Sequence, residues 1–245
     1  MSSEQPKHLE TAVETLANYL ESRSAAEFTR STFSRRLLRS VSSASGRLLA
    51  RRALTMAASP LQRRKAGALS RQATLRLHLG SSINHLSEWI NIDLMGDGAD
   101  LVWDLTRPLP FPDGSVDAIF HEHVLEHLPL PTATSLMKDC QRVLKQGGVL
   151  RIGVPDAGAY LESYCNDGVF VSSNRPDRPT RLLAIQEVFF DHGHRSAYDF
   201  ETLALLFEHT GFCSVEHRSF GDSRIQPCPD GEGRRAETLY VEAVR

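Results

Sequence analysis

The stretch LPFPDGSVDAIFHEHVLEHL, residues 109–128, decides the fold. Its first residues form a loop punctuated by proline and glycine, and the apolar run that ends at Phe120 predicts a buried β-strand. Leu125 and Leu128 follow at helical spacing, so a helix that packs on a sheet is expected to begin there. A strand that leads straight into a helix is the repeating unit of α/β proteins with a parallel sheet.

Similar strand and helix patterns continue on both sides of this stretch. Alternating apolar runs that stop at turn residues predict further strands, and two segments with one apolar face predict helices. The strands are expected over 75–80, 89–94, 99–105, 148–156, 212–220 and 237–245, and the helices over 132–145 and 199–210. Gly147-Gly148 is expected to close the first helix, and Asp199 to cap the second. A polar loop separates the last two strands, which predicts an antiparallel hairpin beside a mostly parallel sheet.

The first third of the chain differs in charge from the rest. Residues 1–76 contain 14 Lys and Arg against 5 Asp and Glu, whereas residues 77–245 contain 14 against 25. This asymmetry predicts an extension over 1–74 and a main domain over 75–245. Residues 5–29 show helical spacing, and the basic stretch 30–72 is expected to form one or two amphipathic helices or to be partly disordered.

Three interpretations of the basic stretch stay open. It can pack on the main domain, or residues 30–76 can bind nucleic acid or an anionic membrane surface. The stretch contains no Trp or Tyr to stack on bases or to anchor at a lipid interface, which weakens the two binding interpretations.

The cysteines and apolar segments exclude other classes of protein. Cys140, Cys165, Cys213 and Cys228 show no close paired spacing, which predicts reduced thiols. No apolar run approaches the roughly 18 residues of a membrane-spanning helix. The first ten residues lack the basic and apolar regions of a signal peptide. The chain is therefore expected in the cytoplasm.

Small and polar residues follow the first four predicted strands. In an open α/β sheet, ligands bind outside the carboxyl ends of the strands, near the switch point. An acid at the end of the second strand can accept hydrogen bonds from both ribose hydroxyls, and one after the third can accept from the exocyclic amine of adenine. The residues at these ends are, in order, Gly80, Ser81 and Ser82, then Asp93, then Asp104, then His121, Glu122 and His123.

This ordered series resembles the class I S-adenosylmethionine-dependent methyltransferases, in particular their type 11-like members, over residues 75–245. The segments 109–128 and 143–156 carry the resemblance most specifically. WINIDL, residues 89–94, after a short glycine loop, is similar to a subgroup associated with sugar or polysaccharide modification. Residues 194–212 also resemble the segment before that family's closing hairpin. The resemblance implies a Rossmann-like, mostly parallel seven-stranded sheet.

The resemblance also implies an activity, which is in-line transfer of a methyl group from S-adenosyl-L-methionine to a small or glycan-type hydroxyl acceptor. Because an alcohol is a poor nucleophile at neutral pH, a histidine is expected to act as general base, and His123 and His194 are the candidates. Residues 160–181 are expected to form an insertion on the substrate side. The implied cofactor contacts are Gly80, Ser81, Ser82, Asp93, Leu94, Asp104, Leu105, His121 and Glu122. Arg175, Arg178 and Arg181 either meet an anionic group of the acceptor or are solvated.

Departures from the family pattern keep an alternative open. His78 stands where the family has an acid before its first glycine, and serines replace further glycines. The interval between Gly80 and Asp93 leaves little room for a helix. The alternative is a catalytically degenerate methyltransferase-like domain that serves as a binding or scaffold module.

Two further enzyme classes fit single motifs. His123, Glu126 and His127 match the H-x-x-E-H signature of a zinc peptidase class, with His192 and His194 as further ligands. That motif normally lies within a long helix, whereas here it joins a strand end to a helix start, so no metal is expected. A nicotinamide-dependent oxidoreductase needs a G-x-G-x-x-G turn, which GSSINH (80–85) lacks.

Overall fold

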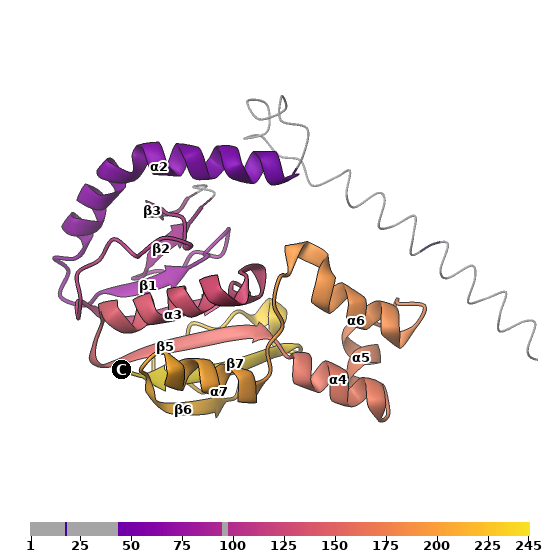
Figure 1. Ribbon diagram of the computed structural model, residues 1–245. Helices are drawn as coiled ribbons and strands as arrows, with labels where there is room; N and C mark the ends of the chain where they lie inside the picture. Colours follow the sequence, from indigo (N-terminus) through magenta and orange to yellow (C-terminus); the bar gives the residue numbers. More distant parts are fainter. Residues whose placement is uncertain (1–17, 19–43, 95–97) are drawn as a thin grey trace, which may run out of the picture.

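The computed structural model describes Asn18, residues 44–94 and residues 98–245 (Figure 1). Apart from Asn18, the helix expected over 5–29 lies outside the described residues. Among the helices that are described, none combines the length and the apolar character that a membrane crossing requires.

A seven-stranded sheet forms the centre of the molecule, in the order β3-β2-β1-β4-β5-β7-β6. Strands β3, β2, β1, β4 and β5 run parallel to one another, whereas β7 is antiparallel to both β5 and β6. The mostly parallel sheet and its antiparallel C-terminal hairpin are therefore confirmed. The strands are β1 (Arg76–Leu79), β2 (Ile90–Asp93), β3 (Leu101–Val102), β4 (Val116–Glu122), β5 (Leu144–Pro155), β6 (Cys213–Arg218) and β7 (Thr238–Val244).

Helices α3 (Leu130–Val143) and α7 (Phe200–His209) cover one face of the sheet and complete the main core (Figure 1). Asp199 caps α7 as predicted, because its carboxylate accepts the Thr202 N–H at 2.8 Å. The predicted end of α3 was wrong. Leu144 is fully buried and pairs with Val116, so the chain enters β5 before it reaches the two glycines.

The helix expected to begin at Leu125 is also interrupted. Leu125–His127 form a single 3-10 turn, η2, and the α-helix starts only at Leu130 after Pro129. Proline lacks an N–H and fixes its own φ, so it favours a helix start over a helix interior. The interruption leaves η2 at the rim of the sheet, directly behind the end of β4.

The long connection between β6 and β7 packs on the face of the sheet opposite to α3 and α7. The short connection between β1 and β2 contains no helix, in agreement with the limited interval between Gly80 and Asp93. Ile225, from the long β6–β7 connection, packs with Trp89, Ala118 and Phe120 on this face. Arg151 of β5, with no exposed surface, binds Asp230 and the Asp222 carbonyl of the same connection.

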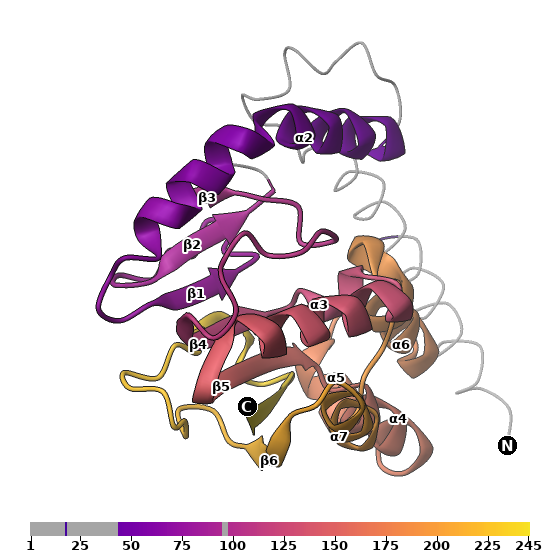
Figure 2. The ribbon, with the colours of Figure 1, turned by 60° about the vertical axis from the view of Figure 1, so that its left-hand side comes forward.

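Helix α2 (Ala44–Leu69) belongs to the basic stretch and packs beside β3 (Figure 2). Ala66 enters the main core, and Gln62 accepts the Val102 N–H at 3.3 Å. The guanidinium of Arg63 lies over the ring of Trp103, 5.4 Å from its centroid. The described part of the basic stretch is thus one helix that packs on the main domain. Contact of residues 30–76 with nucleic acid or an anionic membrane stays a prediction.

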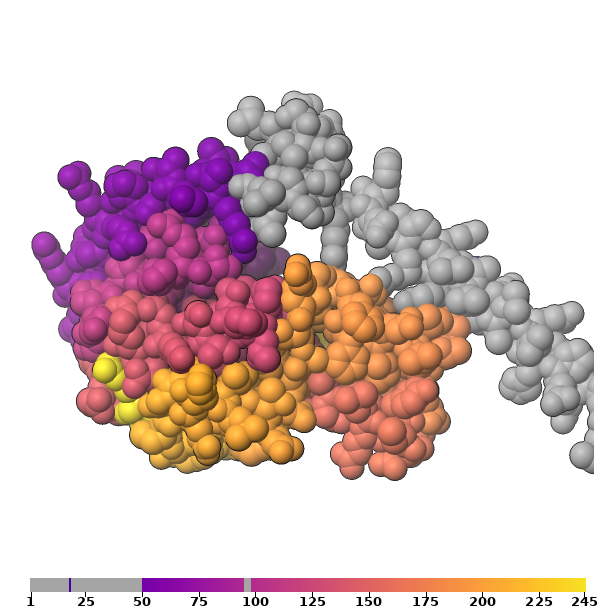
Figure 3. Space-filling view, in the orientation of Figure 1, coloured from indigo at the N-terminus to yellow at the C-terminus, as the bar shows by residue number. Residues whose placement is uncertain are grey.

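Helices α4 (Ala157–Cys165), α5 (Val169–Asn174) and α6 (Arg181–Phe190) follow the end of β5 (Figure 1). They form a small core of their own around Tyr160, Val171 and Val188. Figure 3 shows them as a lobe at the right of the molecule. This lobe includes the predicted insertion over 160–181 and stands at the carboxyl end of the sheet.

Candidate functional site

The carboxyl ends of β1 and β4 lie side by side, because these two strands pair directly in the middle of the sheet. Two cavities open there, of about 490 Å³ and 420 Å³. Gly80 and Glu122 line both of them. The larger cavity extends toward the α4–α6 lobe, where Glu187 and Val188 contribute to its wall.

The turn after β1 joins the end of β2. Gly80 has φ +68°, and a Cβ at this position would lie 2.4 Å from Val124 Cγ2, so only glycine fits. The Ser82 N–H donates to Asp93 Oδ2 at 3.0 Å. Ser81 is buried, and its hydroxyl has no hydrogen-bond partner among the described residues. Four of the predicted cofactor residues therefore come together at this turn.

The acid after β3 is engaged by the protein itself. Asp104 is buried, forms an ion pair with Arg52 Nε at 3.3 Å, and accepts the hydroxyl of Thr106 at 2.8 Å. Leu105 packs against the main core, and Leu94 follows β2 directly before residues 95–97, which lie outside the description. Leu94, Asp104 and Leu105 line neither of the two cavities.

The end of β4 separates its two predicted cofactor residues. Glu122 Oε1 accepts the Tyr240 hydroxyl at 2.7 Å and the Gly231 N–H at 3.3 Å, beside both cavities. His121 has no exposed surface, and its ring nitrogens have no hydrogen-bond partner among the described residues. Burial lowers the pKa of His121 to about 4, so its imidazole is neutral at pH 7. The His121 side chain is thus part of the interior.

His123 sits at a strained position next to the larger cavity. Its φ is +54°, in the left-handed region that non-glycine residues enter at a cost of about 1–3 kcal/mol, and such strain clusters at functional sites. The main-chain N–H of His123 is fixed by the Gly153 carbonyl at 2.8 Å. In the side chain, Nε2 lies 2.9 Å from Thr238 Oγ1 and Nδ1 lies 3.2 Å from Glu126 Oε1.

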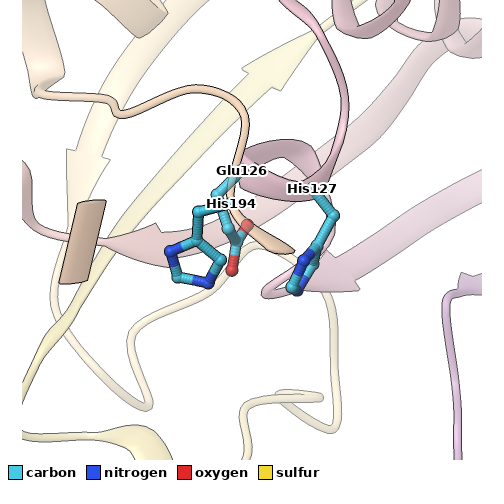
Figure 4. A group of neighbouring side chains, drawn as sticks. All are labelled: Glu126, His127 and His194. Carbon is cyan, nitrogen blue, oxygen red and sulfur yellow. The ribbon is translucent and has the colours of Figure 1, made fainter. Parts of the chain in front are cut away.

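A second group of polar side chains converges on the same cavity. Glu126 and His127 of η2 meet His194, which follows the 3-10 turn η3 (Asp191–Gly193), and one ligand atom of each lies within 4.8 Å of the others (Figure 4). The ring centroids of His127 and His194 are 4.9 Å apart. Of the histidines named for the rival metal site, His127 and His194 thus lie together with Glu126. The sequence signal for Glu126 was its place in the H-x-x-E-H motif.

The arginines of the insertion are mostly paired within the lobe. Arg178 forms an ion pair with Glu187, and Arg181 donates to the Asp167 carbonyl at 2.9 Å. Arg175 lines the larger cavity, where its guanidinium lies 2.6 Å from Glu237 Oε2. Glu237 and Arg234, which also line this cavity, were not anticipated, because they come from the irregular end of the β6–β7 connection.

Comparison with known proteins adds a family match. The model of a methyltransferase domain matches residues 92–152, which run from the end of β2 to the middle of β5. No curated protein matches the sequence. Among solved structures, a SAM-dependent methyltransferase from Archaeoglobus fulgidus is 15% identical with a TM-score of 0.44, over 80% of this chain and 94% of that one. A 1,6-didemethyltoxoflavin-N1-methyltransferase from Burkholderia thailandensis, with bound S-adenosylhomocysteine, is 10% identical with a TM-score of 0.42, over 75% and 77%.

Proposed function

We propose that the chain is a class I S-adenosylmethionine-dependent methyltransferase that methylates a hydroxyl of a small-molecule or glycan-type acceptor, and the match of residues 92–152 to a methyltransferase domain supports this proposal. The observation that carries the proposal is His123, an imidazole held between Thr238 and the buried carboxylate of Glu126 at the wall of the larger cavity. Such an imidazole is the base that a hydroxyl acceptor requires. The glycan-type acceptor is proposed from the likeness of residues 89–94 to sugar-modifying members of the family.

The residues at the β1 and β4 ends fit the cofactor. S-adenosylmethionine supplies a methyl group on a positively charged sulfonium. Gly80 allows close approach of the backbone, and the unpartnered hydroxyl of Ser81 offers a hydrogen bond. Asp93 is placed to accept from the ribose hydroxyls. The adenine contact proposed for Asp104 requires its carboxylate to share or exchange the Arg52 partner.

His123 is proposed as the general base. The Thr238 hydroxyl donates to the Arg234 carbonyl at 2.7 Å, so it must accept from His123 Nε2–H. The Nδ1 lone pair of the neutral ring is then left to take the acceptor proton. Arg234 Nη1 lies 3.4 Å from Nδ1. The carboxylate of Glu126 stabilises the imidazolium that forms.

The proposed step balances as a displacement. The acceptor oxygen forms a bond to the methyl carbon while the carbon–sulfur bond breaks, and the electron pair of that bond stays on sulfur. The hydroxyl proton passes to His123 Nδ1. The protein's work is to align the oxygen with the methyl group and to exclude water. His194 lies in the same cavity and is proposed to contact the acceptor side of it.

The proposal is tested with a panel of acceptors. Purified protein is incubated with S-adenosylmethionine whose methyl group is deuterated, and with monosaccharides, oligosaccharides and phenols, each matched by an amine or carboxylate analogue. Mass spectrometry is expected to find a labelled methyl ether in a hydroxyl acceptor, together with S-adenosylhomocysteine. Transfer to nitrogen or carboxylate acceptors alone would refute the hydroxyl assignment.

Replacing His123 by asparagine is expected to lower kcat by more than about tenfold, since general base catalysis contributes about 10²–10⁴ in rate. Asparagine tolerates the left-handed backbone of this position, so the fold is preserved. The affinity for S-adenosylmethionine, measured by calorimetry, is expected to stay within about twofold. Unchanged kcat would remove His123 from the mechanism.

Asp93→Ala is expected to weaken S-adenosylmethionine binding about 100-fold or more. Two hydrogen bonds from the ribose to a charged carboxylate are worth about 1.5–3 kcal/mol each, and about 2.8 kcal/mol corresponds to 100-fold. Isothermal calorimetry measures the effect, with Asp113→Ala as a control that removes one acidic side chain from the loop before β4, beside Arg142. Equal affinity of the two variants would contradict the ribose assignment.

A further inference from the structure

The group formed by Glu126, His127 and His194 has a buried carboxylate at its centre. Glu126 is 1% exposed, and its Oε2 has no hydrogen-bond donor among the described residues. The site therefore holds a buried carboxyl group with an oxygen that is open to a ligand beside a cavity.

A main-chain carbonyl engages each of the two imidazoles beside this carboxylate. His194 Nδ1 donates to the Val188 carbonyl at 2.5 Å, and His127 hydrogen-bonds the main-chain carbonyl of Gly193. Each ring therefore has one nitrogen engaged by the backbone and a second nitrogen that can bind a ligand. A histidine whose second nitrogen is held by a carbonyl is the usual form of a metal-ligating histidine.

The charge around the site favours a cation. The larger cavity is lined by four carboxylates and two guanidinium groups. The carboxylates are Glu122, Glu126, Glu187 and Glu237, and the guanidinium groups are Arg175 and Arg234. Arg175 faces Glu237 and Glu187, and Arg234 faces His123, so neither of these two guanidinium groups is paired with Glu126.

We infer that Glu126, His127 and His194 bind one divalent first-row transition-metal ion at the wall of the acceptor cavity. Two imidazoles and one carboxylate form a common ligand set for Zn²⁺ and its neighbours, and such a set leaves positions open. Ligand atoms that share one Zn²⁺ at about 2.0–2.2 Å lie about 3–4 Å apart, so a small contraction of the observed group closes the site.

The role of the ion rests on the proposed function. A cation at this site lowers the pKa of a hydroxyl that binds it, which eases proton transfer to the base. His123 is not a ligand in this arrangement. Its Nδ1 lies 3.2 Å from Glu126 Oε1, and the ring stays available for the proton. Metal binding and base catalysis therefore depend on different residues, so substitutions can test the two roles separately.

The test measures metal binding without cofactor or acceptor. The full chain is treated with chelator, and Co²⁺ is titrated while its visible absorption bands are recorded, followed by calorimetric titration with Zn²⁺. One ion per chain is expected, with bands typical of nitrogen and oxygen ligands. Glu126→Gln, His127→Ala and His194→Gln are each expected to weaken Zn²⁺ binding at least tenfold. His209→Ala, on the exposed face of α7, and His123→Asn are expected to leave it within about twofold.

Two results would overturn the inference, namely the absence of saturable binding at one ion per chain, or binding that the three ligand variants leave unchanged. Circular dichroism checks that each variant is folded, and Glu126→Gln preserves the shape of the side chain if the histidine variants unfold. Because the readout contains no methyl transfer, a failure here leaves the hydroxyl-acceptor proposal standing. Conversely, transfer to nitrogen alone leaves the metal site standing.

Discussion

Replacement of Arg151 by alanine is expected to lower the free energy of unfolding by about 3–5 kcal/mol, because it removes the cation that contacts two buried carboxylates and leaves Glu242 only Arg218 at 3.7 Å. Arg151 has no exposed surface, and its guanidinium donates to Asp230 at 2.6 Å and to Glu242 at 3.0 Å. The side chains of both acids are at most 2% exposed. Equilibrium denaturation of the wild-type and variant proteins measures the loss.

The location of the loss can be tested separately. Arg151 also donates to the carbonyls of Ser219 and Asp222, so it fastens the β6–β7 connection over the open face of the sheet. Hydrogen exchange of residues 219–236 is expected to accelerate in the variant. Arg224→Ala removes a half-exposed guanidinium from an ion pair with Glu216 on the same connection, and is expected to cost at most about 1 kcal/mol. If the two substitutions lowered the free energy of unfolding equally, burial of the Arg151 ion pairs would add nothing to their contribution to stability.

The second large effect is a loss of stability in mild acid. Burial lowers the pKa of both His78 and His121 to about 4, against about 6.5 in the unfolded chain, although Asn91 and Glu126 respectively act to raise it. Between pH 6.5 and 4 the unfolded chain therefore binds more protons than the folded chain. The free energy of unfolding must fall as the pH falls through this window, by about 3 kcal/mol for each histidine at its lower end.

His121→Leu isolates one of these contributions. The substitution removes a buried imidazole that has no hydrogen-bond partner among the described residues, at a position between Leu79 and Ile152 of the neighbouring strands. The variant is expected to lose about half as much stability as the wild type between pH 7 and pH 4.5 in urea denaturation. The exposed His209, replaced by glutamine, serves as the control and is expected to follow the wild type. The prediction would be contradicted if the free energy of unfolding of His121→Leu fell as much as that of the wild type between pH 7 and pH 4.5.

Most of the strands could be predicted from local patterns in the sequence. Alternating apolar residues and turn residues lie within a few positions of one another, so β1, β2 and β4 and the capped helix α7 could be predicted where they occur. The predicted element boundaries were wrong where pairing between strands set the actual boundary. Leu144 is helical by pattern, but its pairing with Val116 draws it into β5.

The candidate site was predictable in part for the same reason. Gly80 directly follows β1 and Asp93 is the last residue of β2, so parallel pairing alone brings them together. Asp104 also follows its strand, yet its carboxylate is engaged by Arg52 of α2, which no pattern near Asp104 indicates. His121 and Glu122 are neighbours in the sequence, but the pleat of β4 sends one into the interior and the other to the cavities.

The sequence by itself determined the α/β sheet, the resemblance to methyltransferases and the set of polar residues at the strand ends, because periodicity, turns and motifs are local properties. Only the tertiary structure decided which of those residues share a cavity. It placed His194 against η2, and it joined Arg151 to Asp230 and Glu242 across 79 and 91 residues. Contacts of that range depend on how the whole chain packs, since burial and charge pairing are satisfied in three dimensions.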